Sequence, residues 1–320
     1  MQSSSRRVEL KRFDPTKMKN DRLCLFLGRR GTGKSMAMED IMYNMRSEFD
    51  SGVVMSGTET ANQTWGVHVP PSFIYDKYEN GVVRDICRNQ MKLRKEKGGS
   101  IKPVFLVLED VLYDKTLNSD EALRWLFFNG RHAKVFTLIS MQYYASMKPE
   151  LRTQIDYVFL TRQTSVVVKE AIWKHFAGVV PDFESFNRIL ERVTQDYTIL
   201  VLDQTAISNR IEDCMFWYKA KPRPQFKLGN RLFWEFHFAN SATEGELAAT
   251  TSLDLSVPNK QKVEHVSLLP AYASKISTKE TAQRLLTSGE EEGEDDYSVG
   301  DAEGDAASVV DDEDGASSSR

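Results

Sequence analysis

The chain has 320 residues, of which 41% are hydrophobic and 28% are charged. These values exclude a fibrous chain, a wholly disordered chain and a disulfide-rich miniprotein. The net charge of −4 hides two unlike parts, because residues 290–320 carry 13 acidic side chains and one arginine, which leaves +8 for residues 1–289. A basic body is compatible with a polyanionic partner.

Three widely spaced cysteines lack the spacing of a metal site and predict small buried thiols in a reducing compartment. No apolar run reaches the roughly 18 residues that span a bilayer. The basic N-terminus lacks the apolar segment of a secretory signal. We therefore expect an intracellular, soluble protein without a transmembrane segment.

Apolar runs and helix-forming stretches alternate along the chain. Residues 1–20 are polar and basic and predict a flexible arm. Strands are predicted at 22–27, 53–56, 103–108, 135–140, 157–161 and 197–203. Helices are predicted between them at 36–49, 76–97, 120–129, 147–154, 166–176 and 182–193. This alternation predicts an α/β fold with a mainly parallel sheet flanked by helices.

The composition changes after residue 239. The aromatic stretch 231–238 predicts a last edge strand, and we expect one domain over residues 21–239. Residues 240–289 predict a weakly ordered peripheral segment, and residues 290–320 a disordered acidic tail, because like charges with few aromatics cannot build a core.

A glycine-rich loop follows the first predicted strand and precedes the first long helix. It reads Gly28-Arg29-Arg30-Gly31-Thr32-Gly33-Lys34-Ser35 and matches G-x4-G-K-[ST] in full. Its backbone amides and the helix N-terminus favour a triphosphate. We expect Lys34 to reach the β- and γ-phosphates of ATP and Ser35 to bind Mg²⁺. The alternative, a chance glycine-rich turn, does not explain the strand–loop–helix context.

Two acids, Glu109 and Asp110, end the strand predicted at 103–108. By position, Glu109 would contact Mg²⁺ and Asp110 would polarise the attacking water. The usual order is Asp-Glu or Asp-Asp, so the division of roles between the two carboxylates stays open. The alternatives are an acid pair that caps the next turn and an ATP sensor that never hydrolyses.

Polar residues also flank the strand predicted at 135–140. Gln142 follows it and is expected beside the γ-phosphate, where it could orient water or report the nucleotide state. Arg131 precedes the strand and Arg152 follows it. Either arginine could act on the site of a neighbouring subunit in phosphoryl transfer, with a slight preference for Arg131; an ordinary surface salt bridge is the alternative for each.

Together these motifs resemble the genome-packaging ATPases of nucleocytoplasmic large DNA viruses, a branch of the FtsK–HerA superfamily of P-loop motors. The resemblance covers residues 20–220. It rests on GRRGTGKS, VFLVLED, NGRHAKVFTLISMQ, PELRTQIDYVFLTRQ and ILVLDQTAISNRIEDCMFWYKA.

The resemblance implies a RecA-like sheet, ATP hydrolysis with Mg²⁺, and a homo-oligomeric ring that is a hexamer or a pentamer. It also implies translocation of double-stranded viral DNA into a capsid, in the host-cell cytoplasm or at the viral assembly site, with capsid or internal-membrane proteins as further partners. Residue by residue it assigns nucleotide and metal contacts to Lys34 and Ser35, the second acidic motif to Glu109 and Asp110, and the sensor to Gln142. The arginine in trans is Arg131 or Arg152.

DNA gripped without sequence readout needs basic side chains on its phosphates. Arg84, Arg88, Lys92 and Lys95 share one face of the helix predicted at 76–97, and two further basic clusters lie at 6–12 and 219–223. The alternative for each cluster is an ordinary solvated face. Two other functions compete with a DNA motor: a nucleoside or nucleotide kinase, and a nucleotide-switched virion assembly factor that moves nothing.

Overall fold

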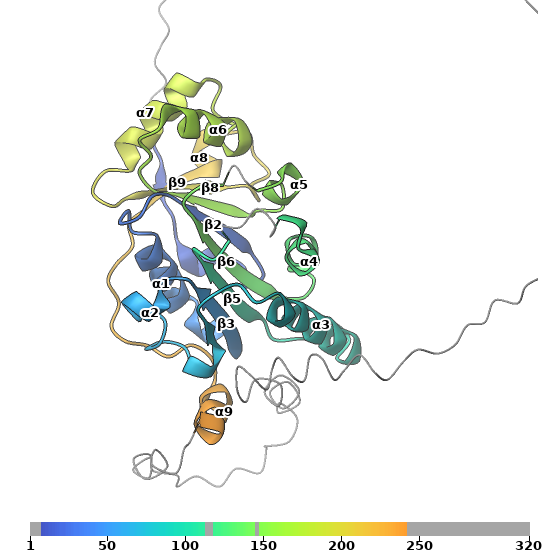
Figure 1. The fold of residues 1–320 in the computed structure, drawn as a ribbon. Helices are drawn as coiled ribbons and strands as arrows, with labels where there is room; N and C mark the ends of the chain where they lie inside the picture. Colours follow the sequence, from blue (N-terminus) through green and yellow to red (C-terminus); the bar gives the residue numbers. More distant parts are fainter. Residues whose placement is uncertain (1–7, 113–117, 145–146, 242–320) are drawn as a thin grey trace, which may run out of the picture.

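Continuous apolar runs form the centre of the molecule, because a strand buried on both faces needs apolar residues at successive positions. The computed structural model describes residues 8–112, 118–144 and 147–241. Within them, one nine-stranded sheet has the order β1-β9-β8-β7-β2-β6-β5-β3-β4 (Figure 1). The strands are β1 (Lys11–Arg12), β2 (Leu23–Leu27), β3 (Ser51–Ser56), β4 (Ile74–Tyr75), β5 (Val104–Glu109), β6 (Val135–Met141), β7 (Tyr157–Leu160), β8 (Ile199–Asp203) and β9 (Met215–Tyr218).

The sheet is mainly parallel, as predicted. Only β8 runs antiparallel to its neighbours β7 and β9, and every other pairing is parallel. The strand of the glycine-rich loop, β2, is separated by β6 from β5, the strand that ends in the acid pair. One strand between the strand of the loop and the strand of the acid pair is the order found in RecA-like P-loop proteins, and this order confirms the predicted fold class.

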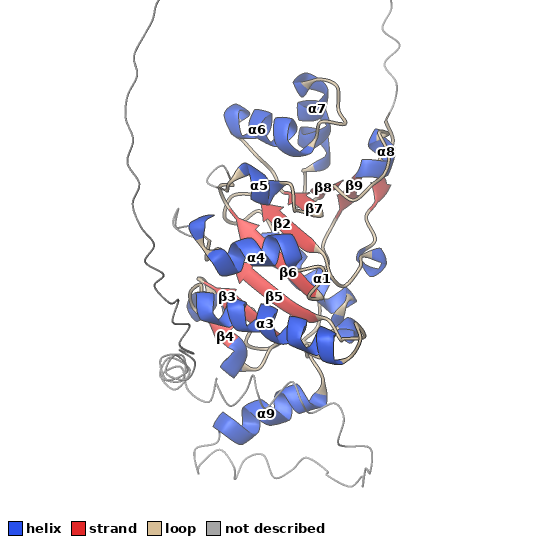
Figure 2. Cartoon of the chain, turned by 90° about the vertical axis from the view of Figure 1, so that its right-hand side faces the viewer, coloured by secondary structure: helices blue, strands red, loops and turns tan. Residues whose placement is uncertain are grey.

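Helices cover both faces of the sheet. Helix α1 (Lys34–Asn44) lies against one face, and α3 (Asn80–Glu96) and α4 (Glu121–Asn129) lie side by side against the other (Figures 1 and 2). The remaining α-helices are α2 (Glu59–Asn62), α5 (Pro149–Arg152), α6 (Val166–Phe176), α7 (Phe183–Val193), α8 (Ile211–Cys214) and α9 (Arg231–Ser241). Among the helices described, none has the length and apolarity to cross a bilayer.

The prediction of a flexible arm at residues 1–20 is wrong for residues 8–20. Strand β1 pairs with β9, and the Phe13 ring is buried among aromatic rings of two strands, β7 and β9, including those of Phe159 and Tyr218. Buried apolar side chains in a basic stretch, Phe13 and Met18, therefore anchor the segment to the core. Residues 1–7 lie outside the described residues.

The prediction of an edge strand at 231–238 is also wrong, because these residues belong to α9. Asn230 caps the helix through its side-chain oxygen, which accepts a hydrogen bond from the Phe233 amide at 3.0 Å. Phe233 is fully buried, and its ring centroid lies 4.3 Å from that of Phe73. Packing against Phe73 thus overrides the strand preference of the aromatic residues.

The predicted C-terminal segments at 240–289 and 290–320 lie outside the described residues from residue 242 onward. The three cysteines, Cys24, Cys87 and Cys214, are buried free thiols, as predicted.

Candidate nucleotide site

The carboxyl ends of β2, β5, β6 and β7 meet at one edge of the sheet, which we call the carboxyl edge. Parallel strands gather the loops that follow them, and such an edge is where α/β proteins bind ligands. The glycine-rich loop connects β2 to α1 here, the acid pair ends β5, and Gln142 follows β6. The fold therefore brings these predicted residues to one edge.

The loop has the backbone of a phosphate cradle. Gly31 and Gly33 take positive φ values of 73° and 91°, which side chains rarely adopt. Gly28 allows a close approach of β7, since a Cβ at this position would lie 1.7 Å from Thr161 Oγ1. The Thr161 hydroxyl also lies 2.7 Å from that of Thr32 and so joins the loop to the end of β7.

Lys34 is held inside the loop. Its side chain is 6% exposed, and its Nζ donates hydrogen bonds to the carbonyl oxygens of Gly28 at 2.8 Å and Arg29 at 3.1 Å. Burial lowers the pKa of Lys34, and the nearby carboxylates of Asp110 and Glu109 partly oppose this shift. A buried ammonium whose hydrogen-bond partners are neutral carbonyls would be stabilised by the negative charge of a phosphate.

Glu109 contacts the loop through Ser35 and is 3% exposed. One oxygen accepts a hydrogen bond from the Ser35 hydroxyl, and the other accepts from Trp65 Nε1 at 2.7 Å and Ser56 Oγ at 3.1 Å. All three donors are neutral. The adjacent oxygens of Ser35 and Glu109 are the hard donors that Mg²⁺ prefers, so these residues fit a magnesium ion.

Asp110 lies beyond the end of β5 with a positive φ of 50°. Its amide donates to the Ser140 carbonyl oxygen at 3.3 Å, and Ser140 Oγ donates to its carboxylate, also at 3.3 Å. The Asp110 side chain is thus tied to β6 and does not share the hydrogen-bond partners of Glu109. Gln142 is exposed at the end of β6.

The two candidate arginines lie elsewhere. Arg131 precedes β6 and therefore lies at the opposite edge of the sheet, the amino edge, where it forms a 2.5 Å ion pair with the buried Asp156. Arg152, at the end of α5, donates from Nε to the Met147 carbonyl oxygen at 2.8 Å and contacts the ring of His175. Neither arginine joins the phosphate loop of its own chain.

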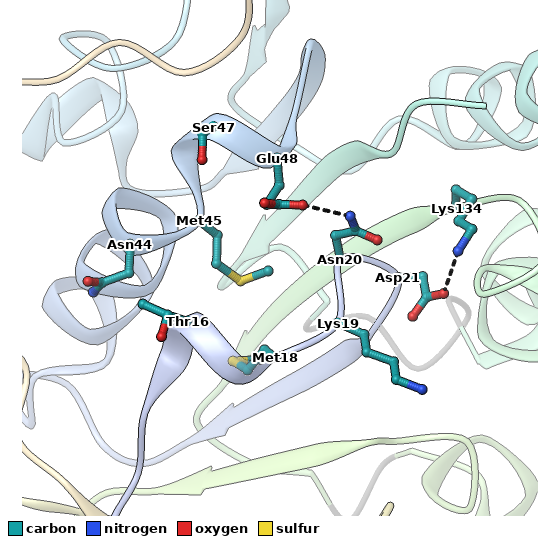
Figure 3. A pocket seen from close by; sticks show the side chains of 10 residues that line it. All are labelled: Thr16, Met18, Lys19, Asn20, Asp21, Asn44, Met45, Ser47, Glu48 and Lys134. Carbon is teal, nitrogen blue, oxygen red and sulfur yellow. Dashed lines mark hydrogen bonds and ion pairs between the residues drawn. The ribbon is translucent and has the colours of Figure 1, made fainter. Parts of the chain in front are cut away.

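The amino edge also holds a polar pocket of about 460 Å³ (Figure 3). Two polar contacts cross it: Asn20 Nδ2 donates to Glu48 at 2.8 Å, and Lys134 Nζ pairs with Asp21 at 3.0 Å. This pocket lies away from the glycine-rich loop and shares no residue with it.

Three residues of this site were not predicted from the sequence. Trp65 and Ser56 hold Glu109, and Thr161 holds the loop. Ser56 and Thr161 could have been found from their places at the ends of β3 and β7, since such ends line the carboxyl edge. Trp65 lies in a loop beyond α2 and carries no comparable signal.

The loop geometry, the buried lysine and the acid at the end of β5 define a P-loop NTPase fold. No family model matches the chain. Protein 015R of Frog virus 3 is 31% identical over 68% of this chain and 68% of its own length, and protein L437 of Acanthamoeba polyphaga mimivirus is 30% identical over 72% and 84%. The chain belongs to the family of these viral proteins.

Among solved structures, the genome packaging NTPase B204 of Sulfolobus turreted icosahedral virus 2, in complex with ATP-gammaS, aligns with a TM-score of 0.44 and 14% identity. The alignment covers 64% of this chain and all of that one.

Proposed function

We propose that the protein is an ATP-hydrolysing motor that moves double-stranded viral DNA into a capsid during virion assembly. The observation that carries this proposal is the contact between Glu109 and the Ser35 hydroxyl, because it joins the acidic strand end to the phosphate loop. A phosphate loop without a carboxylate at this position would only bind a nucleotide. The viral family and the resemblance to packaging ATPases support the cellular role.

Residues of the loop would bind the triphosphate. The backbone amides from Gly31 to Ser35 would donate to the phosphates, and the Lys34 ammonium would exchange its two carbonyl partners for β- and γ-phosphate oxygens. Ser35 and Glu109 would hold Mg²⁺, which neutralises charge on the phosphate oxygens when it is bound. Burial lowers the pKa of Lys34, and the negative charge of a bound phosphate would raise it again.

Hydrolysis needs a base for water, and Asp110 is the candidate. The Ser140 contact holds its carboxylate apart from that of Glu109, which leaves Asp110 free of the metal-binding role. It would accept a proton as water attacks the γ-phosphorus and ADP leaves. Gln142, exposed at the end of the intervening strand β6, would orient this water or report the nucleotide state.

An arginine from a neighbouring subunit would complete the site in a ring. The contacts favour Arg152 over Arg131. Arg131 is engaged by Asp156 of its own chain, whereas no carboxylate of the described residues lies within ion-pair distance of Arg152. A guanidinium without a counter-charge is available to a phosphate.

The basic face of α3 is the candidate DNA surface. Arg84, Arg88, Lys92 and Lys95 are exposed and line one groove of about 710 Å³ together with Trp125 of α4. Helices α3 and α4 lie side by side in Figure 2. Phosphate contacts by such side chains carry no sequence preference and weaken as salt rises. We place the protein in infected cells, with capsid or internal-membrane proteins as docking partners.

The test is the ATPase rate of the purified chain with and without duplex DNA. We expect hydrolysis that duplex DNA stimulates, and a loss of about 100-fold or more in Lys34→Ala. Arg188→Ala, an exposed i,i+4 ion-pair change on α7, is the matched control and should keep the rate. A rate that ignores DNA contradicts the motor, and phosphate transferred to a nucleoside instead of water would indicate a kinase.

A further inference from the structure

Tyr197 has an unusual backbone beside the phosphate loop. It lies in the turn between α7 and β8, where the Thr198 amide donates to the Gln195 carbonyl oxygen at 2.9 Å. The two central residues, Asp196 and Tyr197, both have positive φ values, 49° and 58°. These are the φ signs of a type I′ turn, whose second central position is normally glycine.

Packing in the core does not explain the tyrosine at this position. A bulky residue at positive φ is an outlier, and the ring of Tyr197 is 70% exposed, so its burial cannot offset the strain. Strained residues of this kind gather at ligand-binding sites. The exposed ring itself is therefore the feature to explain.

The topology brings this ring to the phosphate loop. Because β8 runs antiparallel to β7, its first residues lie at the carboxyl edge, where Leu200 pairs with Leu160. A Cβ built on Gly33 would lie 3.6 Å from Tyr197 Cδ1, which is van der Waals contact. Met36, on the first turn of α1, is 45% exposed near the same loop.

We propose that Tyr197 is the nucleobase platform of the site: its ring stacks on the base of the nucleoside triphosphate whose phosphates the loop binds. This inference rests on the proposed nucleotide site and adds the group that recognises the base. A ring stack accepts any nucleobase, since every base has a π face. The platform thus adds affinity for a nucleoside over free polyphosphate, with little choice among bases.

The experiment compares MgATP with magnesium tripolyphosphate, which has the phosphates but no base, by calorimetric titration of the full chain. In Tyr197→Gly we expect about 10-fold weaker binding of ATP and unchanged binding of tripolyphosphate. Tyr197→Phe should bind ATP as the original chain does. Because glycine suits this turn, Tyr197→Gly should fold at least as well, and its melting temperature checks this.

Tyr143→Ala is the matched control, since Tyr143 is 62% exposed and follows β6 at the same edge. A further readout is Tyr197→Trp, whose indole fluorescence ATP should quench and tripolyphosphate should not. The platform is overturned if Tyr197→Gly leaves the ratio of the two affinities unchanged, or if Tyr143→Ala changes it instead. A chain that binds neither ligand overturns the nucleotide site itself, and the platform with it.

Discussion

A buried carboxylate lies at each edge of the sheet, Glu109 at one and Asp156 at the other, and the two have opposite kinds of partner. At the carboxyl edge, Glu109 accepts hydrogen bonds from two hydroxyls and an indole. At the amino edge, Asp156 faces the guanidinium groups of Arg131 and Arg22 at 2.5 and 3.8 Å and accepts a hydrogen bond from the Leu23 amide. Both are nearly inaccessible to water.

The difference separates a site from a structural contact. Neutral donors orient Glu109 but leave its charge for a cation, whereas the arginines already balance the charge of Asp156. Burial raises the pKa of Asp156 all the same, against the opposing effects of the Leu23 amide and the arginines. Substitutions at the two edges should therefore affect different quantities, activity at one and stability at the other.

The largest effect is expected for Arg152, which forms no ion pair with a carboxylate among the residues that the structure describes. Arg152→Ala should lower the ATPase rate by about 1,000-fold, as for other arginines that act in trans. Mixed with Lys34→Ala, itself inactive, it should regain activity, because each subunit type supplies what the other lacks. Failure of the mixture to recover, in particles shown to contain both variants, would count against a role in trans.

Glu109→Gln should lower the ATPase rate by about 100-fold or more, because it removes the charge that we assign to the metal. The free energy of unfolding should change by less than about 1 kcal/mol, since the amide keeps an acceptor for Trp65. Steady-state kinetics and denaturant titration measure the two quantities. A stable variant with full activity would remove the metal role from Glu109.

Asp156→Asn is the matched change at the amino edge and should have the reverse effect. It leaves Arg131 without its counter-charge and Arg22 with Asp21 alone, which should lower the free energy of unfolding by about 1–3 kcal/mol. The ATPase rate per folded molecule should change by no more than about two-fold, which is far less than the loss of about 100-fold expected when a contact to the transition state is removed. If activity falls and stability does not, the contrast between the edges is wrong.

The smallest effect is a dependence on pH. Folding raises the pKa of Asp156. Between the pKa of the unfolded state and the higher pKa of the folded state, the folded protein holds a proton that the unfolded chain has lost. The contribution of this group to stability therefore grows as the pH falls through the interval between these two pKa values. Arg131→Ala removes an exposed partner and should cost about 1 kcal/mol near pH 7. The cost should shrink as the pH is lowered from about 7 into the range where this carboxyl group, with its raised pKa, takes up a proton. Thermal melts across this range would show a constant difference if Asp156 were not the partner that matters.

The sequence predicted the parallel strands and the phosphate loop because both depend on local patterns. Apolar runs mark strands buried on both faces, and the loop motif fixes its own backbone. The acid pair was predicted as a site because it follows directly on an apolar strand. Contacts between distant segments were not predictable: Trp65 reaches Glu109 from a loop, and Phe13 joins the sheet from a stretch that is otherwise polar.

Helix α9 is a case in which the local sequence pattern predicted the wrong element. Its aromatic residues favour a strand when read locally, and only the packing of Phe233 on Phe73 and the cap from Asn230 select the helix. Asp156 likewise looks like any acid before a strand, and its two arginine partners come from other loops.

The magnesium dependence of ATP binding tests the central claim most directly. Calorimetric titration of the original chain and of Glu109→Gln, each with Mg²⁺ and with a chelator, gives four affinities. We predict that Mg²⁺ tightens ATP binding in the original chain by about 10-fold or more and has little effect in Glu109→Gln. Equal gains from Mg²⁺ in both proteins, or none in the original chain, would contradict the assignment of Glu109 to the nucleotide site.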